Sequence, residues 1–405
     1  MQRPFIAFCA AAAITASASA GLAAGPETPK IESAQVFLGP TVIGPNYKVK
    51  PRVRSDGLMR LFDVETPYGN FQFAGVEFTK MRLRELDAVA ALEKMSQSDR
   101  FMNSLGRAAF APIQFGANLI ANPADTINRS MSGVANMLDR GVAGLANTSS
   151  DRDQLVESLL GVSDTQRQLA VELGVDPYTD FPPLAERLKQ MAGAMAGGSL
   201  PVKAGIALIP GGIGIAVSSV SSVDEAKDTL RTKTAAQLIA ETRGTLQSLE
   251  VPDESIERLV ENRNYTPADL IIMSRALAKL GAANSTAFVD DAAKADTRDL
   301  AFYERRLVEL MAARSAQLGG LASFTTIAGH LVNIDRKGNV VAVYPLDDLS
   351  WSEVPRRSIT KATAELRRER PRDHPVFATT GAVTPMATDE MKKLGWRIVE
   401  LKPLP

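Results

Sequence analysis

The sequence predicts a helix-dominated α+β protein with an N-terminal β-hairpin, a central multi-helix array and a small C-terminal α/β unit. Over 58–74, apolar and polar residues alternate, which is the period of a half-buried strand. Between about 76 and 318, several segments have apolar residues every three or four positions, as on one face of a helix. The last ninety residues return to short apolar runs separated by turn signals. We therefore divide the chain into a signal peptide (1–24), a flexible linker (25–56), a helical domain with the hairpin (57–322) and a small α/β domain (323–405).

Residues 1–24 have the three parts of a cleavable secretion signal. Arg3 supplies the positive charge, 5–16 is uncharged and apolar, and Ala18-Ser19-Ala20 or Leu22-Ala23-Ala24 offers small residues to the peptidase. The apolar run is shorter than the roughly 20 strongly apolar residues that a membrane span needs. We expect cleavage of this signal and a periplasmic or secreted mature protein.

The composition argues against disulfides, nucleic acid and nucleotide cofactors. The only cysteine, Cys9, lies within the predicted signal, so we expect no disulfide in the mature chain. Lysine plus arginine balance aspartate plus glutamate at 46 each, so no overall field favours nucleic acid. No glycine-rich phosphate-binding motif is present, and we expect neither a nucleotide nor another cofactor.

The segment 25–56 is expected to lack regular structure. Proline and glycine resist helices and strands, and this segment contains five prolines: Pro26, Pro29, Pro40, Pro45 and Pro51. The hairpin that follows is expected to turn at Pro67-Tyr68-Gly69-Asn70, and a helix is expected from Val76.

Capping signals divide the central region into helices. Ser163 and Gln166 form one capping-box pair, and Thr266 precedes Pro267 with Asp269 in the capping-box position. A proline-containing connector at 175–183 separates two helices, and the most strongly patterned helix is expected from Thr297 to about Leu318.

Two stretches carry few charges, 104–146 and 204–223. The second is long enough to enter a membrane, but Pro210-Gly211-Gly212 at its centre would leave backbone groups unpaired in lipid. We favour packing of both stretches in the protein core, and membrane association remains the alternative.

The C-terminal unit contains the candidate site residues. A strand at 376–379, a helix at 385–394 and a strand at 396–401 follow a hairpin at 331–344. Asp373 and His374 precede the first strand and Thr380 follows it, so a hydroxyl, a base and a carboxylate are candidates for a catalytic set. The Gly-x-Ser-x-Gly motif of many hydrolases is absent, and an exposed turn is the favoured interpretation.

Four residues are candidates for ligand binding. Thr380, Gly381 and Thr384 lie where a strand meets a helix, a place where backbone N–H groups can bind an anion. Thr384 and Pro385 also have the pattern of a simple helix start, which we favour. Trp351, near Asp347-Asp348, could stack on a sugar or anchor a small core. With two histidines and no mature cysteine, we expect no metal site.

Leu173-Gly174-Val175-Asp176-Pro177-Tyr178-Thr179 resembles a recurring element of exported proteobacterial proteins. The segment Thr380-Gly381-Ala382-Val383-Thr384-Pro385, with Gly395-Trp396, is similar to their C-terminal part. The resemblance implies a cell-envelope setting and supplies no catalytic residues.

The sequence thus favours a non-catalytic periplasmic or secreted cell-envelope protein that binds a protein or another envelope partner. Two alternatives stay open. One is a membrane-associated or pore-forming helical protein that uses the low-charge stretches. The other is a hydrolase built on the C-terminal unit, so the sequence does not decide whether the protein is an enzyme.

Overall fold

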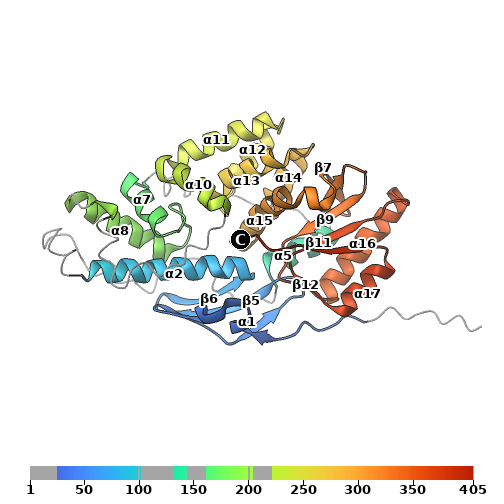
Figure 1. Cartoon of the computed structure of the whole chain (residues 1–405), viewed down its shortest axis with the longest axis horizontal. Helices are drawn as coiled ribbons and strands as arrows, with labels where there is room; N and C mark the ends of the chain where they lie inside the picture. Colours follow the sequence, from blue (N-terminus) through green and yellow to red (C-terminus); the bar gives the residue numbers. More distant parts are fainter. Residues whose placement is uncertain are drawn as a thin grey trace, which may run out of the picture.

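A computed structural model describes residues 25–98, 101, 131–143, 161–198, 201–203 and 221–404 (Figure 1). The predicted signal peptide and most of both low-charge stretches lie outside these residues. The described part confirms a helix-dominated α+β fold with an N-terminal antiparallel sheet and a C-terminal mixed sheet.

The N-terminal sheet has six strands in the order β1-β4-β5-β3-β2, with β6 paired to β5. Its strands are β1 (Glu32–Ser33), β2 (Ile43–Gly44), β3 (Tyr47–Val49), β4 (Arg52–Ser55), β5 (Arg60–Thr66) and β6 (Gly69–Ala74). The expected hairpin is β5–β6, in which Phe62 lies opposite Phe73 and Thr66 opposite Gly69. The turn therefore falls where the sequence places it.

The prediction of an irregular linker at 25–56 was wrong. This segment forms β1–β4 and the short helix α1 (Ala34–Leu38), which extend the sheet on the hairpin. Pro40, Pro45 and Pro51 all lie between strands, where no ladder N–H is required. The strands are two to four residues long, and their inward side chains, such as Val49 and Val53, are buried. Pairing within the sheet thus gives this segment a regular structure that its composition does not predict.

Three central helices begin where capping chemistry predicts, after Ser163, Thr266 and Thr297. Ser163 accepts a hydrogen bond from the N–H of Gln166, and Thr266 and Asp269 form a complete capping box. The patterned helix that follows Thr297 ends at Arg314, four residues earlier than expected, and continues as a 3-10 turn. The helices up to this point are α2 (Val76–Ser96), α5 (Gly133–Ala143), α7 (Asp164–Glu172), α8 (Pro182–Gly198), α10 (Ser221–Thr232), α11 (Ala235–Ser248), α12 (Asp253–Val260), α13 (Pro267–Leu280), α14 (Ser285–Ala292) and α15 (Arg298–Arg314).

The C-terminal sheet has five strands in the order β13-β11-β9-β8-β7. The first three strands along the chain pair antiparallel, and β9, β11 and β13 pair parallel. A short parallel pair, β10 with β12, lies beside it. The elements are β7 (Leu321–Ile327), β8 (His330–Asp335), β9 (Val340–Tyr344), β10 (Asp348–Leu349), α16 (Glu353–Glu369), β11 (Val376–Thr379), β12 (Ala382–Val383), α17 (Pro385–Lys393) and β13 (Arg397–Glu400).

Two hydrophobic cores meet at α15. One core joins the C-terminal sheet to α5 and α11–α15, and the other joins the N-terminal sheet to α2, α7 and α8. Phe302 of α15 packs in the second core and its neighbour Tyr303 in the first. The predicted boundary at 322/323 falls inside β7, within the first core. No helix in the described residues combines the length and apolar character that crossing a lipid bilayer requires.

Candidate functional site

The structure separates the residues of the hypothesised catalytic set. His374 precedes β11 and Thr380 follows it, so the two lie at opposite ends of this strand. At ~3.3 Å per strand residue, about 20 Å separates their backbones. A nucleophile and its base must approach to hydrogen-bond distance, so Thr380 and His374 do not form such a pair.

Asp373 and Thr380 instead have structural partners. The Asp373 carboxylate accepts hydrogen bonds from the N–H of Val340 at 3.1 Å and from Arg370 Nε at 2.7 Å. It thus links the segment before β11 to the start of β9 and the end of α16. The Thr380 hydroxyl donates to the carbonyl of Leu346 at 2.9 Å. Both polar groups therefore stabilise connections around the C-terminal sheet.

The ligand-binding candidates also have structural roles. Thr384 caps α17 and accepts from the N–H of Ala387 at 3.2 Å, as the helix-start interpretation predicts. A Cβ on Gly381 would lie 2.7 Å from the Asp347 backbone, so glycine permits two loops to pass closely. Trp351 is buried in the core, which confirms the anchor interpretation and leaves no exposed face for a sugar.

One serine–histidine contact was missed by sequence reasoning. Ser358 Oγ lies 2.9 Å from His330 Nε2 beneath α16, although 28 residues separate the two in sequence. Burial lowers the pKa of His330 to about 4, and the nearby Lys361 acts in the same direction. The adjoining apolar cavity measures about 40 Å³, which is room for water and not for a substrate. The pair therefore satisfies two buried polar groups.

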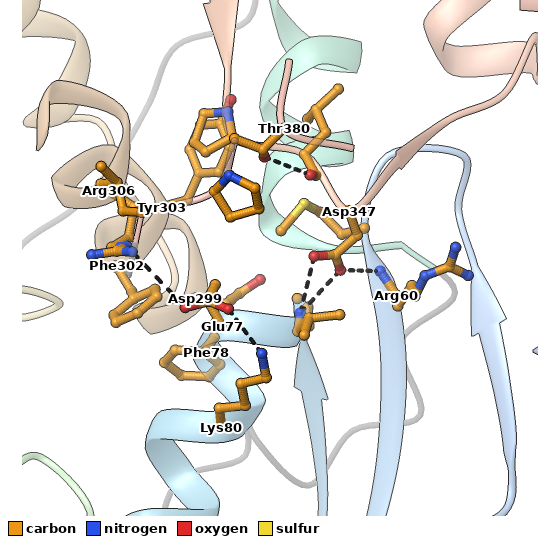
Figure 2. A pocket seen from close by; sticks show the side chains of 18 of the residues that line it. Arg60, Glu77, Phe78, Lys80, Asp299, Phe302, Tyr303, Arg306, Asp347 and Thr380 are labelled. Atoms are coloured by element: carbon orange, nitrogen blue, oxygen red, sulfur yellow. Dashed lines mark hydrogen bonds and ion pairs between the residues drawn. The ribbon is translucent and has the colours of Figure 1, made fainter. Parts of the chain in front are cut away.

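The cavity best suited to a ligand lies between α2 and α15, and its volume is about 370 Å³ (Figure 2). It is at the low end of the range typical of small-molecule sites. Its other walls include Phe37 of α1, residues 59–60 and 74–75 of the N-terminal sheet region, the 345–347 loop, Thr380 and the C-terminal residues Pro403 and Leu404. On α15 the lining residues recur at three- and four-residue spacing, which places them on one face of the helix: Asp299, Phe302, Tyr303, Arg306 and Leu310.

Asp347 fixes one end of this cavity. Its carboxylate accepts the N–H of Arg60 at 2.8 Å and that of Val76, the first residue of α2, at 3.0 Å. Burial raises the pKa of Asp347 to about 7, opposed by these two hydrogen bonds and reinforced by the charge of Asp348. A loop of the C-terminal unit thus holds both the N-terminal sheet and the start of α2.

Charged side chains from the two facing helices form another wall. Glu77 lies between Lys80, at 3.2 Å, and Arg306, at 3.9 Å (Figure 2). Arg306 also pairs with Glu309 at 2.8 Å. Within the described part of the chain, Arg84 makes no ion pair. Burial lowers its pKa, Glu77 opposes this shift, and the neighbouring Arg306 and Arg305 add to it.

The rest of the cavity wall is apolar. Phe78 and Phe302 meet edge to face with ring centroids 5.5 Å apart. The other apolar lining residues include Phe37, Met59, Leu310, Leu346 and Leu404. This combination of an apolar surface and a few charged groups is typical of a ligand site. Among the described residues, no three histidine, cysteine, aspartate or glutamate side chains lie together so as to hold a metal ion.

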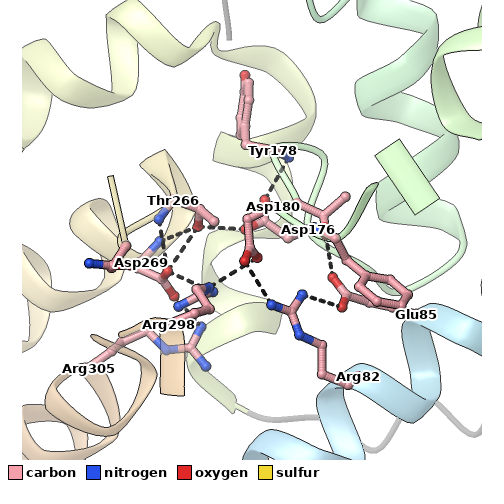
Figure 3. A network of polar contacts seen from close by, with 12 residues as sticks. Arg82, Glu85, Asp176, Tyr178, Asp180, Thr266, Asp269, Arg298 and Arg305 are labelled. Carbon is pink, nitrogen blue, oxygen red and sulfur yellow. Dashed lines mark hydrogen bonds and ion pairs between the residues drawn. The ribbon is translucent and has the colours of Figure 1, made fainter. Parts of the chain in front are cut away.

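A second polar cluster holds the cavity walls in position (Figure 3). Asp180 lies between Arg82 of α2, at 2.7 Å, and Arg298 of α15, at 3.1 Å. Arg298 also pairs with Asp269 of α13 at 2.9 Å, and Arg82 pairs with Glu85. The cluster includes Asp176, whose carboxylate accepts from Thr266 and from the N–H of Tyr178. The connector at 175–183 thus joins three helices.

Comparison with known proteins identifies no relative. No protein-family model matches the chain, and neither a curated protein nor a solved structure matches it.

Proposed function

We propose that this chain is an exported, non-catalytic binding protein of the cell envelope, and that the cavity between α2 and α15 receives its partner. One observation carries the proposal. The cavity combines an apolar wall with a charged wall that contains an arginine without an ion pair in the described part of the chain. Such a surface is suited to a partner that presents a negatively charged group on an apolar body.

The polar groups around the cavity support binding rather than catalysis. The Asp347 carboxylate is occupied by two backbone N–H groups, and Glu77 lies between two cations. The histidine–serine pair adjoins the other cavity, beneath α16. No histidine is among the described residues that line the larger cavity, and the hydroxyl of its Thr380 donates to the carbonyl of Leu346.

Export is proposed from the sequence of the first 24 residues. The test is to express the full chain in a Gram-negative host, fractionate the cells and sequence the N-terminus of the recovered protein. We expect the periplasmic fraction to contain a chain that begins shortly after Ala20 or Ala24. Recovery of a chain beginning at Met1 from the cytosol would overturn the envelope assignment.

Binding is tested on the same material by native mass spectrometry under non-denaturing conditions. We expect a fraction of the mature protein to carry a small molecule that is lost when Leu310, buried in the cavity wall, is replaced by tryptophan. Leu366→Trp is the control, because Leu366 is a buried residue of α16 that does not line the cavity. Loss of the adduct in both variants would argue against this cavity as the site.

The membrane-associated alternative concerns 104–146 and 204–223. Of the first stretch, the structure describes 131–143, where Val134, Ala135 and Leu138 are buried in the core shared with the C-terminal sheet. Residues 204–220 lie outside the described part. Flotation of the mature protein with liposomes separates the two functions, because a membrane-associated protein moves with the lipid.

A further inference from the structure

The charged wall of the cavity has an excess of positive charge at one point. Lys80 and Arg84 lie on α2 at positions three and seven residues after Glu77, so all three project from one side of the helix. Arg306 faces them from α15. Glu77 is shared by Lys80 and Arg306, and Glu309 also pairs with Arg306. Glu77 and Glu309 therefore compensate the charges of Lys80 and Arg306, and neither carboxylate pairs with Arg84.

Among the described residues, no carboxylate is in contact with Arg84. Arg305, which with Arg306 opposes the charge of Arg84, is paired with Asp269 at 3.3 Å. The closest acidic groups, Glu77 and Glu85, are in contact with other cations, since Glu85 pairs with Arg82 at 2.9 Å. A partly buried guanidinium beside two like charges is unfavourable unless an anion accompanies it.

The acidic residues that line the cavity, unlike Arg84, already have partners of their own. The carboxylate of Asp347 accepts two backbone N–H groups. The carboxylate of Asp299 accepts the N–H of Gly133 at 2.9 Å. Each acidic group at the cavity thus has donors within the described chain, whereas Arg84 has no acceptor among the carboxylates described.

The apolar wall determines what carries the anion. Phe78 and Phe302 present rings beside the charged wall, and Leu346 and Leu404 close the other side. A fully hydrated inorganic anion would leave this surface without a partner. An anionic group on an apolar body would cover both walls.

We propose that the cavity binds a small amphipathic anion, with a carboxylate or phosphate group at Arg84 and Lys80 and an apolar body against Phe78 and Phe302. This inference rests on the proposed function, because it names the ligand class for the same cavity. Arginine suits the role since its planar fork of N–H donors matches both anionic groups.

The test compares four ligands of equal chain length on the mature protein by isothermal titration calorimetry: decanoate, decyl phosphate, decanol and decyltrimethylammonium. All are used below their critical micelle concentrations. We expect decanoate or decyl phosphate to bind at least about tenfold more tightly than decanol, because a charged hydrogen bond contributes this much. The stronger of these two identifies the anionic group.

Arg84→Gln is the decisive variant. We expect it to weaken binding of the preferred anion about tenfold to a hundredfold and to leave decanol binding unchanged. Its melting temperature should stay close to that of the wild type, because the substitution removes a partly buried charge and its repulsion from Arg306 and Arg305, which offsets the lost attraction to Glu77. Arg275→Gln is the matched control, since Arg275 is similarly placed on a helix surface, pairs with Glu241 and does not line the cavity.

The outcomes separate the two proposals. If decanol binds as tightly as the anions and Arg84→Gln changes nothing, the anion assignment is overturned and the cavity remains an apolar site. Preference for decyltrimethylammonium would likewise overturn it. If none of the four ligands binds, the assignment falls, and the native mass spectra then decide whether the cavity binds any small molecule at all.

Discussion

Asp180 accepts a hydrogen bond from Arg82 at 2.7 Å, although 98 residues separate the two in the sequence. Arg82 is completely buried in α2, and Asp180 also accepts from Arg298 of α15. These two helices provide the facing walls of the candidate cavity. The contact therefore links the connector at 175–183 to the geometry of the proposed site.

We expect Asp180→Asn to destabilise the protein by about 3–5 kcal/mol, because it leaves two buried guanidinium groups without their shared carboxylate. Urea unfolding followed by circular dichroism measures this loss. Asp164→Asn is the control, since Asp164 pairs with Arg167 but is 83% exposed, and its loss should cost less than about 1 kcal/mol. Equal effects of the two substitutions would show that the network does not stabilise the fold.

The Asp180 substitution should also alter acid stability. Burial favours protonation of Asp180, but Arg82 and Arg298 outweigh it and hold the carboxyl pKa well below its usual value. The folded state therefore binds this proton more weakly than the unfolded state. The stabilisation is complete above the unfolded pKa near 3.8 and is lost as the pH falls below it. Asp180→Asn should flatten this acid limb of the stability curve.

Asp347→Asn should change the pH dependence in the opposite sense. Burial raises the pKa of Asp347 from 3.8 to about 7, so the folded state binds this proton more tightly than the unfolded state. The free energy of unfolding should therefore fall as the pH rises from about 4 to 7. In Asp347→Asn this slope should be smaller by up to the contribution of one bound proton. Urea titrations at a series of pH values measure it. An unchanged slope in Asp347→Asn would show that this carboxyl does not contribute to the pH dependence.

Thr384→Ala should destabilise the protein by about 1 kcal/mol, the usual cost of losing an N-cap. Its hydroxyl accepts from the N–H of Ala387 and donates to the carboxylate of Glu27, so the substitution also loosens the N-terminal segment. Limited proteolysis should then cut within 25–31 faster than in the wild type. Thr360→Ala is the control, because its exposed hydroxyl only donates to a carbonyl within α16. An unchanged cleavage rate would mean that Glu27 is held by Trp351 alone.

Ser358 should not react with a fluorophosphonate probe of serine hydrolases. The hydroxyl and its partner His330 are both buried, and the adjoining cavity is too small for the probe. Intact-mass spectrometry after incubation measures labelling, with a known serine hydrolase as the positive control. Labelling that disappears in Ser358→Ala would support the hydrolase alternative.

Local sequence patterns predicted the elements whose stabilising contacts are close in the chain. The β5–β6 turn and the helix starts at Thr266, Thr297 and Thr384 depend on contacts within about four residues, so capping and turn residues reveal them. Strands β1–β4 were missed because β3 and β4 pair with β5, while β1 and β2 extend the sheet on β4 and β3, so their order comes from the sheet as a whole. Three of the five prolines that suggested a linker, Pro40, Pro45 and Pro51, lie between these strands.

The candidate cavity could not be predicted in the same way. Its lining residues come from α1 near Phe37, the 59–84 region, α15, the 345–347 loop and the C-terminus. The sequence singled out Asp347 only as one of an acidic pair, and gave no reason to connect it with Val76. Arg84 reads as one charge on an amphipathic helix until α15 brings two more arginines beside it.

By itself, the sequence determined the fold class, the hairpin, the helix caps and the helical start at Thr384, because each follows from backbone and side-chain chemistry over a few residues. Tertiary structure alone decided the six-stranded sheet, the Asp180 network and the excess positive charge at Arg84. Those features depend on which distant segments share the space around α15, and charge compensation and burial are properties of that shared space rather than of any single segment.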